Sequence, residues 1–171
     1  TGPSSSIRSM SPLGIGPVLK DRSAVNIGVV SCMSYLDDKG FGPSLVHRNG
    51  VTRARMFQEI TIAQQTDCSD DAALAAALDQ LEATLNSPLG NMKGDYCVGQ
   101  YTLADCAWAG VCQVATNMGK GTAVSSRSAV NTWFAAVQSH PSTSKEAINP
   151  FSCLCTKADH DGNSMRDVRI N

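Results

Sequence analysis

The residue types best suited to metal binding lie near the end of the chain. Cys153 and Cys155 are separated by one residue, and His160 follows between Asp159 and Asp161. A structural zinc site needs four ligands, and its paired cysteines usually have two to four residues between them. One intervening residue is too few for that arrangement, so the spacing does not predict a zinc site.

The same segment contains part of a calcium-loop pattern. Asp159 and Asp161 are followed by a glycine, as in the middle of such a loop. The first and twelfth ligand positions would then be Lys157 and Val168, neither of which can coordinate calcium. The sequence therefore predicts no metal and no other cofactor, and we expect residues 149–171 to be an extended polar tail.

Nucleophilic catalysis also has little support in the residue pattern. The chain has seven cysteines, an odd number without the regular spacing of a disulfide framework. Cys106 and Cys112 lie in an apolar helical segment, where cysteine behaves as a small buried hydrophobic residue. His47, His140 and His160 have no plausible nucleophile-plus-acid companions in sequence. We therefore predict no catalytic residue and expect a reducing, intracellular environment.

The first 20 residues have the composition of a leader. They are rich in serine, proline and glycine, and no acidic residue precedes Asp21. Such a composition is typical of organelle transit peptides, although a flexible tail would look similar. It favours a location in a plastid or mitochondrion after removal of a transit peptide, with the cytoplasm as the alternative.

Charge and hydropathy exclude several classes of partner. The formal net charge is −1, from 14 basic and 15 acidic residues. No basic cluster is larger than Arg53 and Arg55, so we expect no nucleic-acid binding. No apolar stretch approaches the roughly 20 residues that span a bilayer, so we expect no transmembrane segment. A position at the periphery of a membrane complex remains compatible with the sequence.

Hydrophobic periodicity predicts a mainly α fold. Residues 69–86 have a leucine stripe at Leu74, Leu78, Leu81 and Leu85, with spacings typical of a buried helix face. Residues 103–118 are apolar nearly all round, which predicts a central, buried helix. Further helices are expected over residues 31–39, 52–65 and 127–139. The apolar residues 27–30 fit either a strand or the start of a helix.

The most specific local signal lies where the central helix should begin. Thr102 is a good N-cap residue, and Asp105 follows at the third helical position. The carboxylate of Asp105 is then placed to accept the backbone N–H of Thr102, as in a capping box. A buried helix start needs such partners because water cannot satisfy its free N–H groups. We expect this pair to be structural.

The segment Gly99-Gln100-Tyr101-Thr102-Leu103-Ala104-Asp105 resembles the box that begins the central helix in the C-terminal domain of glutathione S-transferases. Tyr35 to Gly40 resembles the end of that family's interdomain linker, and Leu78 to Leu85 resembles the leucine stripe of its second long helix. Trp133 and the segment from His140 to Ser142 resemble its closing landmarks. The resemblance implies an all-helical bundle over residues 35–148, degenerate or truncated relative to the family.

The resemblance also implies where catalysis would lie. In the family, a thioredoxin-like N-terminal domain binds glutathione. A parallel crossover alone takes roughly 30 residues, so the segment before Tyr35 is too short for that whole domain. Residues 1–34 are expected to be an irregular leader or a remnant of it. Pro17 resembles the family's cis-proline, and Asp21 and Ser23 a weak acidic-serine glutathione site, although Arg22 occupies the serine position.

The sequence thus predicts a non-catalytic structural or interaction subunit of a larger assembly, such as a photosynthetic or respiratory complex. Its partners would be other protein subunits. A glutathione-dependent transferase with a degenerate or missing glutathione site is one alternative. A carrier of a hydrophobic ligand or pigment, using the hollow between the first two long helices, is another.

Overall fold

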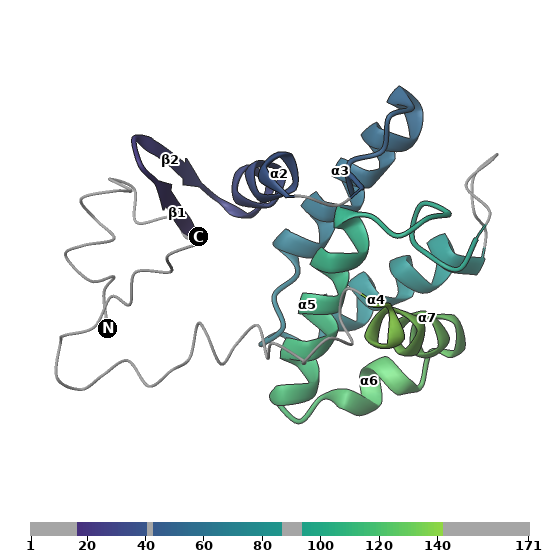
Figure 1. The fold of residues 1–171 in the computed structure, drawn as a ribbon. Coiled ribbons are helices and arrows are strands. Elements are labelled where there is room, and N and C mark those ends of the chain that lie inside the picture. Colours follow the sequence, from purple (N-terminus) through teal and green to yellow (C-terminus); the bar gives the residue numbers. More distant parts are fainter. Residues whose placement is uncertain (1–16, 41–42, 87–93, 142–171) are drawn as a thin grey trace, which may run out of the picture. The chain divides into compact units, whose positions relative to one another are not determined.

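The structure is a computed structural model that describes residues 17–40, 43–86 and 94–141. The described part is mainly α, as predicted, with one small sheet of two strands (Figure 1). In chain order its elements are β1 (Val18–Asp21), β2 (Ala24–Ile27), α2 (Val29–Lys39), α3 (Gly50–Gln65), α4 (Asp71–Asn86), α5 (Leu103–Asn117), α6 (Gly121–Ser125) and α7 (Ser128–Ser139). Residues 1–16 of the predicted leader, and the whole predicted tail over 149–171 with its cysteine, histidine and calcium-like positions, lie outside the described residues.

β1 and β2 form an antiparallel hairpin within the segment that the sequence left as a leader or a domain remnant. Val18 pairs with Ile27 and Asp21 with Ala24, so only Arg22 and Ser23 connect the strands. Arg22 has a positive φ of 52°, a conformation that two-residue hairpin turns require. Regular structure therefore begins at Val18, where an irregular segment was expected. Hydrophobic periodicity could not identify these strands because each has only four residues.

Helix α2 follows the hairpin directly and packs on one of its faces. The sequence left residues 27–30 open between strand and helix, and both occur there: β2 ends at Ile27 and α2 begins at Val29. The Tyr35 hydroxyl donates to Asp21 Oδ2 at 2.6 Å, and the Ser31 hydroxyl donates to Asn26 Oδ1 at 3.3 Å. The strands and the helix therefore form one ββα unit.

Helices α3 and α4 begin at side-chain caps. Asn49 Oδ1 accepts the N–H groups of Val51 and Thr52 at the start of α3. Asp70 Oδ1 accepts the N–H groups of two residues in the first turn of α4, at 2.8 and 3.2 Å. Asparagine and aspartate are favoured at this position because their oxygens satisfy N–H groups that have no partner inside the helix.

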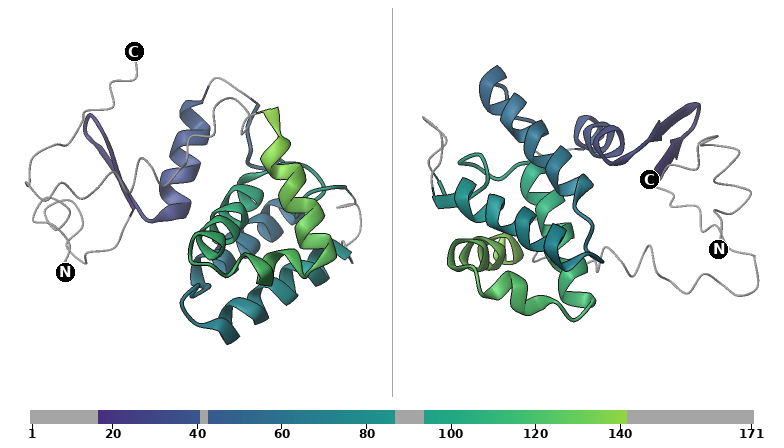
Figure 2. Two further views of the ribbon diagram at one scale, coloured as in Figure 1. Left: turned by 90° about the horizontal axis from the view of Figure 1, so that it is seen from below. Right: turned by 180° about the vertical axis from the view of Figure 1, so that it is seen from behind.

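The hydrophobic core surrounds α5, which is buried along most of its length and packs against α3 and α6 (Figure 1, Figure 2). Its buried side chains are Leu103, Ala104, Asp105, Trp108, Val111, Cys112 and Ala115. The predicted central helix is therefore present. The leucine stripe of α4 also faces the core through Leu74, Leu78 and Leu81, whereas Leu85 is half-buried at its edge.

The short helix α6 was not predicted. The sequence indicated that Gly119-Lys120-Gly121 ends the central helix, and α5 does end at Asn117. A five-residue helix then begins at Gly121 before the chain enters α7, and it buries Val124 in the core. A helix this short has no measurable periodicity, which is why the sequence pattern missed it.

Helix α7 is fixed to α4 by charged side chains. The Glu82 carboxylate on α4 accepts the N–H groups of Ala129 and Val130 at 3.1 and 2.8 Å, and so caps the start of α7. Arg127 donates to Asp79 and to the carbonyl oxygen of Ala75 on α4. Among the helices that the structure describes, none is long and apolar enough to cross a bilayer.

The buried leucine stripe generates a stability prediction. Leu78 is 0% exposed, so Leu78→Ala should lower the free energy of unfolding by about 2–5 kcal/mol, because it leaves a cavity in the core. Leu36 on α2 is 50% exposed and provides the control, where alanine should cost no more than about 0.5 kcal/mol. Chemical denaturation followed by circular dichroism measures both values, and equal losses would contradict the core described above.

Candidate functional site

The capping pair predicted from the sequence is the centre of a buried polar network. Asp105 is fully buried, and its Oδ2 atom accepts the N–H of Thr102 at 2.8 Å and its hydroxyl at 3.2 Å. Its Oδ1 atom accepts the N–H of Cys97 at 3.0 Å and the indole N–H of Trp133 at 2.8 Å. One carboxylate therefore joins the loop before α5, the start of α5, and α7. The contacts between Thr102 and Asp105 have the geometry of a capping box.

A second buried carboxylate was missed by the sequence analysis. Glu59 on α3 is fully buried and receives a salt bridge from Arg55 Nη2 at 2.8 Å. The indole N–H of Trp108 on α5 donates to Glu59 Oε2 at 3.1 Å, and the hydroxyl of Thr84 on α4 lies 3.4 Å from its Oε1. The signal available in the sequence was an Arg and a Glu four residues apart, directly beside the apolar residues of α3.

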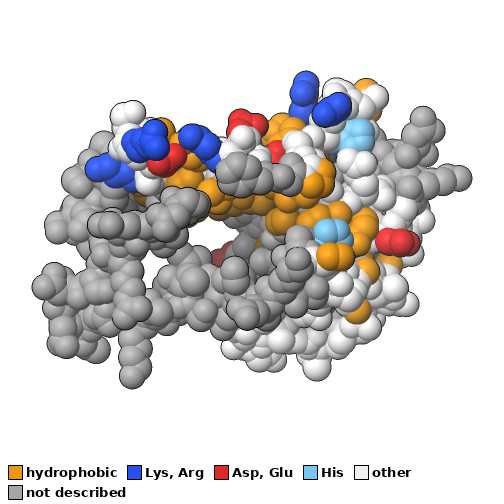
Figure 3. All heavy atoms as spheres, in the orientation of Figure 1, with side chains coloured by type: hydrophobic (Ala, Val, Ile, Leu, Met, Phe, Trp, Pro, Cys, Tyr) orange, Lys and Arg blue, Asp and Glu red, His pale blue; other side chains and the backbone are white. Residues whose placement is uncertain are grey.

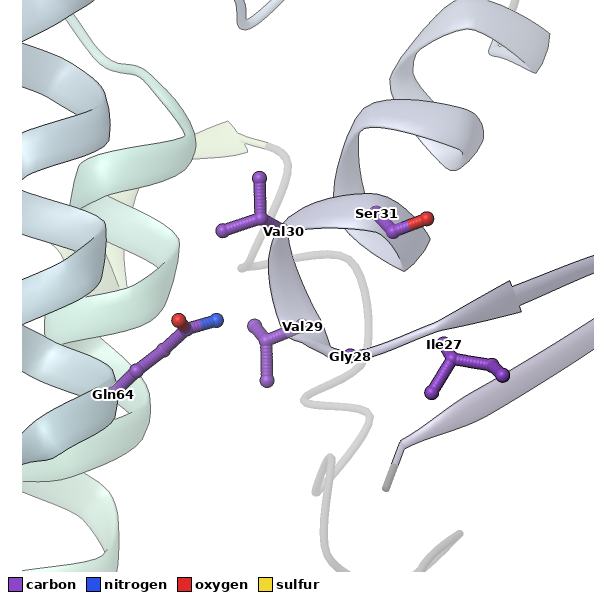
Figure 4. A pocket seen from close by; sticks show the side chains of 6 residues that line it. All are labelled: Ile27, Gly28, Val29, Val30, Ser31 and Gln64. Atoms are coloured by element: carbon purple, nitrogen blue, oxygen red, sulfur yellow. The ribbon is translucent and has the colours of Figure 1, made fainter. Parts of the chain in front are cut away.

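A shallow, open pocket lies at the start of α2. It has a volume of about 330 Å³ and is lined by Ile27, Gly28, Val29, Val30, Ser31 and Gln64 (Figure 4). The first five residues belong to the end of β2 and the first turn of α2, whereas Gln64 comes from α3 and points toward this turn. The pocket thus lies between the ββα unit and the helical core.

Gly28 sets the geometry of this pocket. Its φ of 88° and ψ of 158° belong to a region that only glycine adopts readily. In that conformation its N–H donates to the carbonyl oxygen of Pro17 at 2.8 Å, while its own carbonyl oxygen accepts the N–H of Cys32 at 3.0 Å. Gly28 is the N-cap of α2 and has no side chain to satisfy the first N–H groups of the helix.

The backbone at this helix start can attract an anion. The N–H groups of the first three helical residues have no partner within a helix, and here they belong to Val29, Val30 and Ser31. Together with the helix dipole, such groups favour a carboxylate or phosphate. Among the side chains that line the pocket, only those of Ser31 and Gln64 are polar, and the Ser31 hydroxyl donates to Asn26.

The structure separates the residues proposed as a glutathione-site remnant. Pro17 lies next to Gly28, at the pocket end of the hairpin. Asp21 and Ser23 lie at the opposite end, at the turn, and neither lines the pocket. The hydrogen bond from Tyr35 lowers the pKa of Asp21, and the same bond raises the pKa of Tyr35. Sequence spacing did not show this separation, because the turn was not recognised.

The cysteine thiols in the helical core have low reactivity because they stay protonated. Burial raises the pKa of Cys68, Cys97 and Cys106, and it raises the pKa of Cys112 to about 12. These side chains are therefore neutral thiols near neutral pH, and a neutral thiol is a poor nucleophile and a poor metal ligand. Among the described residues no cluster of histidine, cysteine and acidic side chains could hold a metal ion.

No model of a known protein family matches the chain, and no curated protein matches its sequence. Solved structures do match. A possible glutathione S-transferase from Rhodopseudomonas palustris is 25% identical, with a TM-score of 0.66, over 81% of this chain and 73% of that one. Glutathione S-transferase 1-6 from Anopheles dirus species B is 17% identical, with a TM-score of 0.67, over 87% of this chain and 75% of that one.

A third match is maleylacetoacetate isomerase from Methylobacterium extorquens AM1, determined with bound malonate and GSH. It is 16% identical, with a TM-score of 0.64, and the match covers 82% of this chain and 76% of that chain. The fold is that of the glutathione S-transferases. Each match covers more of the chain than residues 35–148, the range of the sequence resemblance. The likeness to glutathione S-transferases is therefore not restricted to the C-terminal helical domain.

The conformation of Gly28 can be tested directly. Gly28→Ala should destabilise the protein by about 1 kcal/mol or more, because alanine is strained at positive φ even though no atom lies within 4 Å of the added Cβ. Gly110 in α5 also has open space around it but has no positive φ. Gly110→Ala should stabilise the protein by roughly 0.5–1 kcal/mol. Urea denaturation of both variants checks the opposite signs, and a neutral Gly28→Ala would contradict this geometry.

The raised thiol pKa values generate a pH prediction. Cys112 has a reference pKa of 9.0 and a folded-state pKa of about 12, so the folded state holds its proton more tightly than the unfolded state. The contribution of Cys112 to stability should therefore be complete below pH 9 and should decrease as the pH rises from 9 toward 12. Cys112→Ser should reduce this decrease, as measured by denaturation at several pH values. An unchanged pH dependence would contradict the burial of an ionisable thiol here.

Proposed function

We propose that this chain is a module with the glutathione S-transferase fold that binds other protein subunits and does not transfer glutathione. The observation that carries the proposal is the start of α2, where Gly28 and Val29 provide neither a hydroxyl nor a carboxylate beside the pocket. Glutathione carries two carboxylates and an ammonium group. A pocket lined mainly by aliphatic side chains satisfies these charges poorly, and burying an unpaired charge is costly.

The hydroxyl and thiol groups described above support the same proposal. Activation of a glutathione thiol needs a hydroxyl or thiol donor near the bound sulfur. The Tyr35 hydroxyl is hydrogen-bonded to Asp21, and the core cysteines with raised pKa values lie on or near α5. None of these groups lines the pocket, and the hydroxyl that does line it, that of Ser31, donates to Asn26 Oδ1. The buried networks of Asp105 and Glu59 join helices to one another, which suits a rigid scaffold.

The composition of the first 20 residues bears on where the proposed assembly forms. The acid-poor composition of residues 1–20 supports an organelle as the place of assembly. We therefore propose that the partners are protein subunits of a larger complex in a plastid or mitochondrion.

A glutathione-dependent transferase is the second candidate, and one observation favours it. The residues whose backbone N–H groups begin α2 border the pocket, and such uncapped N–H groups can donate to a carboxylate. The three matched structures are described as transferases or an isomerase of this fold, one of them with GSH bound. On this candidate, glutathione would be held by backbone groups and Gln64.

Retention on immobilised glutathione separates the two candidates. The full chain should not be retained, and it should not accelerate thiol transfer to a chlorinated aromatic substrate, because side-chain ligands are missing at Gly28 and Val29. Val29→Ser adds a hydroxyl beside the pocket. If the transferase candidate is right, this variant should bind glutathione about fivefold more tightly than the wild-type chain, as expected for one added hydrogen bond, whereas under the proposed function neither chain binds it measurably. Calorimetric titration with glutathione measures this change, and Val51→Ser, on the exposed start of α3, is the matched control.

The outcome of native purification completes the test. The chain should co-purify with other subunits at fixed stoichiometry. Strong retention of the unmodified chain on glutathione, together with turnover of the aromatic substrate, would overturn the proposed function and establish the transferase.

A further inference from the structure

The start of α3 carries a pair of residues that can react with each other. Asn49 is followed by Gly50, both are exposed, and this is the only Asn-Gly pair in the sequence. The backbone nitrogen of a residue can attack Cγ of a preceding asparagine, which forms a cyclic succinimide and releases ammonia. Glycine has no side chain to hinder this attack, and a Cβ added to Gly50 would meet no atom within 4 Å.

In the folded chain, Asn49 is held by the helix that it caps. Its Oδ1 atom accepts the N–H groups of Val51 and Thr52 at 2.9 and 3.2 Å. Its carbonyl oxygen accepts the N–H of Arg53 at 2.9 Å, and its own N–H donates to His47 Nδ1 at 3.0 Å. These hydrogen bonds fix both the side chain and the backbone of Asn49.

The capped conformation keeps the reacting atoms apart. Asn49 has a φ of −69° and a ψ of 128°. In a succinimide, Cβ of Asn49 and the nitrogen of Gly50 are nearly eclipsed about the Cα–C bond, because these atoms belong to one almost planar ring. A ψ of 128° is far from that arrangement, so the ring can close only after the cap has opened. Helix ends open at a much lower free energy than the core of a protein.

The intermediate and one of its products fit the helix start. Gly50 is the first helical residue, whose N–H has no partner within the helix, so losing that hydrogen breaks no helical bond. When water opens the ring to aspartate, the new carboxylate can still accept the N–H groups of Val51 and Thr52. The helix dipole and the exposed Arg48 and Arg53 favour its charge, and basic side chains lie over the first turns of α3 (Figure 3). The other product, isoaspartate, carries its main chain through the former side chain and loses the cap.

We propose that Asn49 is a site of spontaneous deamidation and that the closed cap of α3 controls its rate. The Gly50 nitrogen loses its proton and bonds to Cγ of Asn49, the Cγ–Nδ2 bond breaks, and ammonia leaves with that proton. Water then adds across one C–N bond of the ring. The reaction consumes one water, releases one ammonia and needs no oxidant or reductant. It places a negative charge at the start of α3 and is independent of the proposed function.

The rate in the full chain is compared with the rate in a synthetic peptide of residues 44–55, which is too short to keep a stable helix. Both are incubated at neutral pH in water labelled with heavy oxygen, and mass spectrometry of the fragments locates the acid. The peptide should deamidate at Asn49 about tenfold faster, because an N-cap shifts the helix equilibrium by about that factor. Equal rates would overturn control by the cap, and an intact Asn49 in both samples would overturn the site itself.

Two variants separate the chemistry from the cap. Gly50→Ala hinders the attacking nitrogen but fits the helix, because Gly50 has no positive φ, and it should suppress the reaction in the chain and in the peptide alike. His47→Ala removes the acceptor of the Asn49 N–H and should raise the rate in the full chain but not in the peptide. An unslowed Gly50→Ala would overturn the proposed reaction. A slower His47→Ala chain would overturn control by the cap, because the imidazole would then be assisting the attack.

The fit of the aspartate product is tested by making it directly. Asn49→Asp should unfold at a temperature no lower than that of the wild-type chain at neutral pH, because the carboxylate keeps the cap and interacts favourably with the helix dipole. Asn49→Ala lacks a side-chain cap and should unfold at a lower temperature. Thermal denaturation followed by circular dichroism measures all three chains. Equal losses in Asn49→Asp and Asn49→Ala would overturn the fit of aspartate at this position.

Discussion

The buried carboxylate of Asp105 is the interaction on which the rest of the helical core depends. A carboxylate removed from water is stable only if its lone pairs are satisfied. Here they accept the backbone N–H and hydroxyl of Thr102, the N–H of Cys97 and the indole of Trp133. These groups come from three separate parts of the chain, so they can meet only when the loop before α5, α5 itself and α7 are all in place. The network therefore links local helix initiation to the packing of the whole core.

Glu59 has the corresponding role on the other side of α5. It joins α3 to α5 through Trp108 and to α4 through Thr84, with Arg55 supplying the compensating charge. Each tryptophan of α5 and α7 thus combines a large apolar surface with one N–H bound to a buried acid. Such fully satisfied polar pairs restrict the ways in which apolar helices can pack, because a shifted helix would leave a charge unpaired.

The parts of the fold that could be predicted from sequence are those with a local physical signal. The apolar residues of α4 and α5 recur at helical spacing, and the Thr102–Asp105 pair forms a cap within one helical turn. The hairpin, α6 and Glu59 depend on contacts far apart in sequence or on segments too short to show a period. The pocket could not be predicted from sequence for the same reason, because Gln64 lies beside Gly28 and Val29 only in the folded chain.

The capping of α7 by Glu82 has a consequence for how the molecule forms. A helix that carries its own N-cap residue can begin to form as soon as its segment is synthesised. The cap of α7 instead comes from a residue more than 40 positions earlier, on α4. Its first turn gains those two hydrogen bonds only after a large loop has closed, and the entropy of that closure opposes early formation. Helix α7, the last of the described helices, should therefore form late in folding, after α4 is in place.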